Sequence, residues 1–189
     1  MPLATVLGVE GFSFRDVSEA SGVPKPTISA LFGSKQELQL AVAEAARRTL
    51  DERVFAAVRD AAPGIARLEV LGSAWLDHLN DPELVGGCFF AASAFELDSR
   101  PGPLHDLVGE QMAGWIDDIA RMIRSAQRAD EVADDVDADD EAQVLFSIGV
   151  TANSLIQLGS PPDAADRARR SWARHLDRLR PTSPSEEPA

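Results

Sequence analysis

The stretch SGVPKPTISALFGSKQEL, Ser21 to Leu38, decides the fold of the first part of this chain. It holds two prolines, two lysines and two glycine breaks. Ser13 is a favourable N-cap for a helix over about 14–21, and Gly22 is suited to end that helix. Because proline is tolerated in the first turn of a helix, the next helix is expected from about 25 or 26 to 32.

A long helix is expected directly after this pair. Ser34 can cap it, with Glu37 at the capping-box position. Residues 3–8 look like the end of an earlier helix, closed by Gly8. Two short helices joined by a tight glycine turn form a helix-turn-helix, whose second helix can enter the DNA major groove. Such pairs are also common in helical proteins that bind no DNA, so the spacing alone leaves both interpretations open.

The second short helix would present polar side chains from its first turn. Lys25 can reach a phosphate or a guanine edge, and Thr27 can contact a phosphate or a thymine methyl group. Lys35 begins the long helix, where free backbone N–H groups already favour an anion. We expect Ile28, Leu31 and Phe32 to pack inward. The candidate DNA-contacting residues are Arg15, Lys25, Pro26, Thr27, Ser29 and Lys35.

Charge is distributed unevenly along the chain. Residues 1–50 carry five basic and five acidic side chains, whereas residues 51–189 carry 13 basic and 26 acidic ones, which gives the net charge of −13. A polyanion would be repelled by the second part. Any contact with nucleic acid therefore belongs in the first fifty residues.

Composition excludes several classes of protein. The 189 residues are 44% hydrophobic, enough for a core, but no apolar run is long enough to span a membrane. The opening MPLATVL lacks the basic lead of a secretory signal. The single cysteine, Cys88, excludes a disulfide framework within the chain. We expect a cytoplasmic protein with no membrane partner.

Helical patterns continue through the rest of the chain, so the expected fold class is all-α. The helix over about 139–158 is apolar nearly all round, which implies burial on two sides. The predicted domains are 1–46, a helix-turn-helix domain with a shortened first helix, 47–180, a helical domain, and 181–189, a disordered tail. Further helices are expected over about 65–79, from 80–82 to near 99, over about 104–123, and from 163 to about 179.

The segment LGVEGFSFRDVSEASGVPKPTISALFGSKQELQLAV, Leu7 to Val42, resembles the N-terminal domain of the TetR family of bacterial transcriptional regulators. The segment GGCFFAASAFELDSRPGP, 86–103, is similar to one subgroup's second domain. The resemblance implies a homodimer with helix-turn-helix heads and helical ligand-binding bodies. It also implies that the last two helices pair with the partner's and that a ligand changes the spacing of the heads.

The resemblance assigns roles residue by residue. It implies that Arg15 and Lys25 contact bases or the groove, that Thr27 contacts a phosphate or a base, and that Lys35 contacts a phosphate. Ser29 occupies a contact position where the family usually has Tyr. The first helix is also shorter than the family's usual one.

Large side chains in the middle helices have two interpretations. Trp75, Phe89, Met112 and Trp115 either fill the core or line a ligand pocket. Asn153 and Gln157, one turn apart, are polar in an apolar helix and need partners, either a ligand or groups across a dimer interface. The sequence predicts a small, largely apolar ligand.

Other patterns argue against enzymatic chemistry. The three histidines are isolated, without the spacing of a helical metal site. The acidic run near residue 135 lacks the glycine and glutamate of a calcium loop. No nucleophile, phosphate-loop or metalloprotease motif is present. We expect no cofactor, no metal and no enzymatic activity, and interpret Cys88 as a buried, inert thiol.

The favoured interpretation is therefore an all-α homodimeric regulator that binds a palindromic operator in double-stranded DNA and is released by a small ligand. A first alternative is a dimeric small-molecule-binding protein with a degenerate DNA-binding head. A second is an enzyme on a helical scaffold. Two or more convergent titratable groups in a pocket would favour the enzyme.

Overall fold

The structure, a computed structural model, describes residues 2–181. The predicted disordered tail, apart from Pro181, lies outside the described residues. Within residues 2–181 every regular element is helical, which confirms the all-α fold class. The elements are α1 (Pro2–Leu7), α2 (Phe14–Ser21), α3 (Lys25–Phe32), α4 (Lys35–Leu50), η1 (Asp51–Phe55), α5 (Ala56–Asp60), α6 (Ile65–Leu79), α7 (Phe89–Leu97), α8 (Pro103–Gln127), α9 (Ala138–Leu158) and α10 (Ala164–Leu179).

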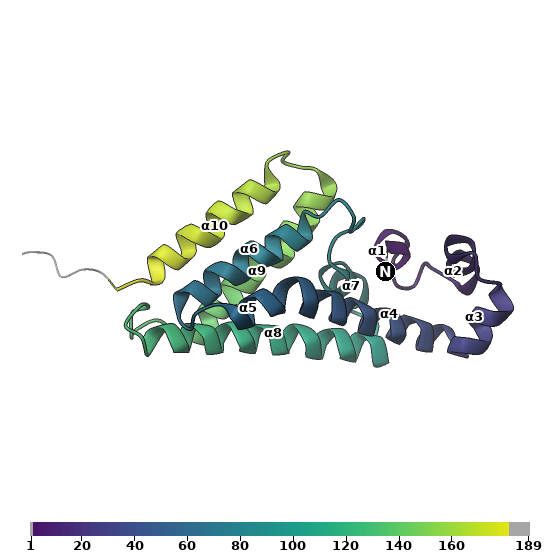
Figure 1. Ribbon diagram of the computed structural model, residues 1–189, viewed down its shortest axis with the longest axis horizontal. Coiled ribbons are helices and arrows are strands. Elements are labelled where there is room, and N and C mark those ends of the chain that lie inside the picture. Colours follow the sequence, from purple (N-terminus) through teal and green to yellow (C-terminus); the bar gives the residue numbers. More distant parts are fainter. Residues whose placement is uncertain (1, 182–189) are drawn as a thin grey trace, which may run out of the picture.

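The head, which we define as α1–α3 with the start of α4, forms one end of the molecule (Figure 1). Ser13 caps α2 in a complete capping box with Asp16, and Ser34 Oγ accepts from the backbone N–H of Glu37 at the start of α4. Gly22 ends α2 with φ 72°, a left-handed conformation that glycine adopts without a steric penalty. These caps confirm the helix pair expected from the sequence.

One helical run joins the head to the rest of the chain. It comprises α4, the single π-helical turn η1 and α5, and it lies alongside α8 (Figure 1). The sequence predicted this long helix but not its π-helical turn. Because α4 begins directly after α3, a displacement of this run would move the candidate DNA-binding helix.

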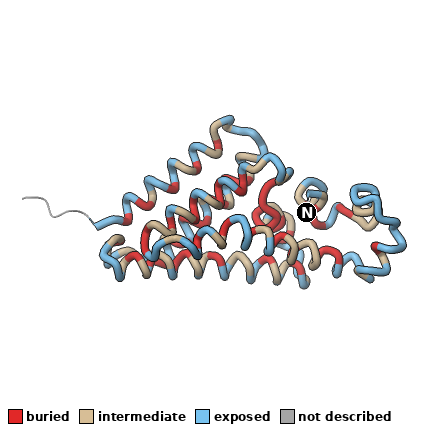
Figure 2. The backbone as a smooth tube through the Cα atoms, viewed as in Figure 1, coloured by how far each residue is buried: buried red, intermediate tan, exposed pale blue. Residues whose placement is uncertain are grey.

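The body, which we define as η1 to α10, is built around an aromatic cluster. Trp75 of α6 packs on Trp115 of α8 with ring centroids 4.3 Å apart, on Phe146 of α9 at 5.7 Å and on Trp172 of α10 at 6.2 Å. Buried positions recur on each of these helices along the length of the body (Figure 2). One apolar core therefore unites the helices of the body.

The prediction that a helix starts at residues 80–82 is wrong, because α7 begins only at Phe89. Residues 80–88 form turns in which the N–H of Gly87 donates to the carbonyl of Leu84. Gly87 has φ 74°, and a Cβ there would lie 2.2 Å from Oδ1 of Asn153. The left-handed backbone at Gly87 and its close approach to α9 therefore prevent the predicted first helical turns from forming here.

Candidate nucleic-acid interface and ligand site

The first turn of α3 projects polar side chains away from the protein. Lys25, Pro26 and Thr27 are exposed, and the side chains of Lys25 and Thr27 have no hydrogen bond or ion pair within residues 2–181. Ile28, by contrast, is buried, as predicted. This exposed turn can therefore meet a phosphate or a base edge without first breaking a contact.

Leu31 corrects the predicted inward face of α3. Its side chain is 75% exposed, whereas Phe32 is half-buried against the core, and Ser29 is half-buried as well. Helical spacing places Leu31 one turn after Thr27, on the open side of the helix. An exposed apolar group there can contact a thymine methyl group, so Leu31 is a candidate contact that sequence reasoning missed.

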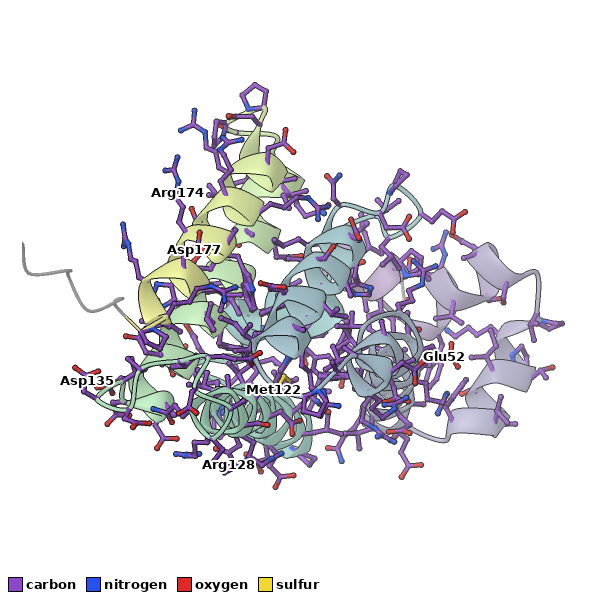
Figure 3. The ribbon with its side chains drawn as sticks, turned by 60° about the vertical axis from the view of Figure 1, so that its left-hand side comes forward. Glu52, Met122, Arg128, Asp135, Arg174 and Asp177 are labelled. Atoms are coloured by element: carbon purple, nitrogen blue, oxygen red, sulfur yellow. The ribbon has the colours of Figure 1, made fainter. Side chains whose placement is uncertain are left out.

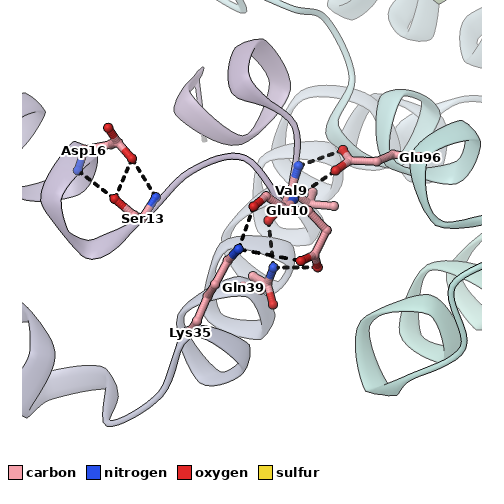
Figure 4. A network of polar contacts seen from close by, with 7 residues as sticks. All are labelled: Val9, Glu10, Ser13, Asp16, Lys35, Gln39 and Glu96. Atoms are coloured by element: carbon pink, nitrogen blue, oxygen red, sulfur yellow. Dashed lines mark hydrogen bonds and ion pairs between the residues drawn. The ribbon is translucent and has the colours of Figure 1, made fainter.

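The side chains of the other two basic candidates, Arg15 and Lys35, already contact groups within the head. Arg15 Nε donates to Glu19 Oε1 at 2.7 Å, and both side chains are well exposed. Lys35 Nζ donates to the backbone carbonyl of Glu10 at 2.5 Å, with the Glu10 carboxylate 3.6 Å away (Figure 4). A DNA phosphate would compete with these contacts.

The same region connects head and body. Glu96 of α7 accepts hydrogen bonds from the backbone N–H groups of Val9 and Glu10, at 2.7 and 2.9 Å (Figure 4). Gln39 of α4 donates to the Val9 carbonyl at 2.7 Å from a buried position. The linker between α1 and α2 is thus held by both α7 and α4.

The predicted pocket residues lie mostly in the packed interior. Trp75 and Trp115 are buried in the aromatic cluster, and neither indole N–H has a hydrogen-bond partner among the described residues. Phe89 is buried against Phe90 and borders a cavity of only about 20 Å³. Met112 is half-buried on α8.

The two predicted amides bind backbone groups of their own chain. Asn153 Oδ1 accepts from the N–H of Cys88 at 2.9 Å, and Gln157 Nε2 donates to the Leu79 carbonyl at 3.2 Å. Both therefore fasten the segment between α6 and α7 to α9. Asn153 is buried and Gln157 is exposed, so the partner that a buried amide needs is supplied to Asn153 by the protein itself.

A cleft of about 590 Å³ opens instead between the α4–α5 run and α8. None of the six predicted pocket residues lines it. Its side chains come from α4, η1, α5, α6 and α8 with its C-terminal end, and they include five arginines. The lining residues are Arg47, Asp51, Phe55, Val58, Arg59, Arg67, Gln111, Asp118, Arg121, Met122, Ser125 and Arg128.

Two titratable groups near α7 are shifted by burial. Burial raises the pKa of the Cys88 thiol, which keeps it protonated and unreactive at neutral pH. Burial, with a smaller contribution from Arg53, lowers the pKa of His78 to about 4. Across residues 2–181 no three or more His, Cys, Asp or Glu side chains gather as a metal site.

The comparisons with known proteins match both parts of this architecture. A family model described as "Bacterial regulatory proteins, tetR family" matches residues 5–42, and one described as "Tetracyclin repressor-like, C-terminal domain" matches residues 64–172, more than half of the chain. The chain belongs to the TetR family. It is accordingly a TetR-family transcriptional regulator with a helix-turn-helix DNA-binding domain.

Solved structures share this TetR fold over nearly the whole chain. A TetR regulator from Chloroflexus aurantiacus is 23% identical with a TM-score of 0.85, covering 94% of this chain and 90% of that one. One from Cytophaga hutchinsonii is 19% identical with a TM-score of 0.83, covering 96% and 91%. A regulator from Saccharomonospora viridis, solved in complex with choline, is 21% identical with a TM-score of 0.78, covering 93% and 90%.

No curated protein sequence is similar enough to this TetR-family chain to count as a relative. The family and the structural neighbours are transcriptional regulators rather than enzymes. In residues 2–181 no helix has both the length and the apolar character needed to cross a membrane.

Proposed function

We propose that this protein is a homodimeric repressor that binds a palindromic operator and is released from it by a small ligand. In this proposal residues 1–46 form the DNA-binding domain and residues 47–180 the ligand-binding and dimerisation domain. The observation that carries the DNA-binding part is the exposed, unpartnered first turn of α3, with Lys25 and Thr27.

Three further features support operator binding through the head. Leu31 extends the exposed face of α3 by one turn. Arg15 lies exposed on α2, where exchanging Glu19 for a phosphate would cost little, since exposed ion pairs contribute little stability. The N-terminus of α4, capped by Ser34, favours a phosphate through its free N–H groups and its dipole.

The test is fluorescence anisotropy of the full chain with a labelled duplex from the DNA upstream of its own gene. We expect specific binding that weakens with salt. Lys25→Ala should reduce affinity about tenfold and lower the salt slope by about one. Arg100→Ala is the matched control, because Arg100 is an exposed cation between α7 and α8, outside the head and outside α9 and α10, and its replacement should leave binding unchanged.

Binding by Lys25→Ala as tight as that of the wild type would contradict the assignment of α3. No binding to any upstream fragment would instead favour the alternative, a ligand-binding dimer with a degenerate head. Two observations support a degenerate head. Lys35 already donates a hydrogen bond to the Glu10 carbonyl, and Ser29, which occupies a contact position, is half-buried.

The outer face of α9 and α10 supports dimerisation through the last two helices. A groove of about 390 Å³ between them is lined mostly by apolar side chains, including Val144, Ile148 and Leu155. Val144 and Leu155 are 43% and 37% exposed, on a helix whose opposite side is buried in the core. A second copy placed on this face would bury the apolar side chains that α9 exposes on the side away from the core.

Ligand relief is supported by the helical run that joins the two parts. The cleft between the α4–α5 run and α8 can hold a small molecule, and α4 begins directly after α3. A ligand that favours one position of this run would shift the population of head arrangements, and DNA would oppose that shift by the same free energy. The similar regulator from Saccharomonospora viridis was solved in complex with choline, which supports small-molecule binding by a protein of this fold.

A further inference from the structure

The cleft between the α4–α5 run and α8 carries positive charge in an acidic protein. Its lining includes five arginines, which are Arg47, Arg59, Arg67, Arg121 and Arg128, but only two carboxylates. The chain as a whole has 31 acidic and 18 basic side chains. The local excess of positive charge therefore runs against the composition of the molecule.

Three of these arginines are paired with carboxylates. Arg59 donates to Asp51 at 2.6 Å, which lowers the pKa of that carboxyl, and Arg121 is paired with Asp118. Arg47 donates to Glu44, which does not line the cleft. These exposed pairs are weak in water, so a ligand anion can compete with them.

The remaining two arginines have no carboxylate partner within residues 2–181. Arg67 donates once, from Nη2 to the Ala61 carbonyl at 2.9 Å, and its Nε is buried without a hydrogen-bond partner. Arg128 is exposed and its side chain has no partner. Both belong to the end of the cleft where α6 begins and α8 ends, since Ile65 N–H donates to Glu131 Oε2 at 2.8 Å.

The cleft also has an apolar part. Val58 is buried, and Phe55 and Met122 are half-buried against the core. Met122 lies on α8, and Arg128 is the residue directly after the end of that helix (Figure 3). The volume of about 590 Å³ falls in the range of small-molecule sites. Guanidinium groups bind carboxylate and phosphate groups in a bidentate geometry, while the apolar side chains suit a hydrocarbon body.

We propose that this cleft binds an amphipathic organic anion, whose carboxylate or phosphate pairs with Arg67 and Arg128 and whose apolar body contacts Phe55 and Met122. This assignment deepens the proposed function and rests on it for its regulatory meaning. Asp51 and Phe55 belong to the π-helical turn η1. Such turns are rare in proteins, and those that occur are often found at functional sites. A ligand here touches the run that carries the DNA-binding head.

The test is isothermal titration calorimetry of the full chain, without DNA, at about 0.15 M salt. The probes share one chain and differ in their head group: octanoate, octyl phosphate, octanol and octylammonium. We expect one or both anions to bind at least about tenfold more tightly than octanol, and octylammonium to bind most weakly. Which anion binds more tightly identifies the head group.

Arg67→Gln and Arg128→Gln should each weaken the tighter anion about tenfold. Arg174→Gln is the control, because Arg174 is also exposed and unpaired but lies on α10 (Figure 3). Arg128 is on the surface, so its variant reports on binding even if Arg67→Gln folds poorly. Equal affinity for octanol and both anions, or wild-type affinity in both cleft variants, would overturn the proposal.

Release of the operator is measured separately by adding the tighter anion to the protein–DNA complex. Anion binding that leaves the operator complex unchanged would support the site and contradict ligand relief. If Lys25→Ala loses DNA binding but still binds the anion, then Lys25 contributes to the DNA site of the head and not to the anion site in the cleft.

Discussion

His78 illustrates, at the scale of one residue, how burial decides chemistry. His78 is 6% exposed, and its Nδ1 has no hydrogen-bond partner in the part of the chain that the structure describes. Desolvation and the nearby Arg53 oppose protonation, Asp81 favours it, and the net effect lowers the pKa to about 4. His78 is therefore neutral in the folded protein under conditions where it is partly charged in the unfolded chain.

This shift predicts a loss of stability in acid. Between pH 6.5 and about 4 the unfolded chain binds a proton at His78 and the folded protein does not, so stability falls as pH falls through that window. The contribution lost by pH 4.5 is about 2–3 kcal/mol. Urea unfolding followed by tryptophan fluorescence at pH 7 and pH 4.5 should show a smaller loss for His78→Asn than for the wild type.

His105→Asn is the control for this measurement, because His105 is on the surface and its replacement should preserve the wild-type loss. An identical loss in wild type and His78→Asn would mean that His78 titrates normally. Carboxylates contribute equally to both proteins, so the difference between them isolates the histidine.

At the scale of elements, α7 ties the head to the body through a single carboxylate. Glu96 accepts from two consecutive backbone N–H groups, those of Val9 and Glu10, and a Cβ at Gly8 would collide with it. Thr5 of α1 adds a hydrogen bond to the Val85 carbonyl at 2.6 Å. The head is therefore held at its linker as well as through α4.

Replacing this carboxylate should loosen the head. Glu96→Ala removes the acceptor of both N–H groups, and hydrogen bonds to charged groups contribute about 1.5–3 kcal/mol each when well shielded. We expect amide hydrogen exchange at Val9 and Glu10 to accelerate at least about tenfold, with α8 unchanged. Glu52→Ala, an exposed carboxylate without an ion pair, is the control. Unchanged exchange at Val9 would show that α4 alone holds the head.

Prediction from sequence succeeded where local signals, such as a capping residue or an apolar stripe, mark a helix. The caps at Ser13 and Ser34 and the stripe of α8 located their helices well. It failed at 80–88, where a contact with Asn153 on a distant helix decides the conformation. It also failed at Leu31, because periodicity gives a helical face but not whether a neighbour covers it.

The same reasoning could not find the arginine-lined cleft. Its basic side chains are spread from Arg47 to Arg128 over separate helical segments, and each looks in the sequence like an ordinary solvated residue. Packing of α4 and α6 against α8, and of α5 against α6, brings them together. The large aromatic residues left core filling and pocket lining both open, and in the structure the rings of Trp75 and Trp115 pack on each other.

At the scale of the whole molecule, the head lies at one end and α10 leads away to the other (Figure 1). A single head of near-neutral charge on a chain of −13 gives weak, non-specific attraction to DNA. Two heads fixed in one dimer bind two half-sites at once, so the second contact becomes intramolecular and affinity rises steeply. The proposed function therefore predicts that operator binding depends on dimerisation.

The dimer is predicted to form through the outer face of α9 and α10. Leu155→Glu places a charge on this apolar face and should weaken self-association at least about thirtyfold, as expected for an interface hot spot. Sedimentation equilibrium should give twice the 20.3 kDa chain mass for wild type and a value near one chain for the variant. Val85→Glu, on an exposed apolar residue outside α9 and α10, should remain dimeric. A dimeric Leu155→Glu protein would place the interface elsewhere, whereas a monomer that folds normally but loses operator affinity would tie DNA binding to this face.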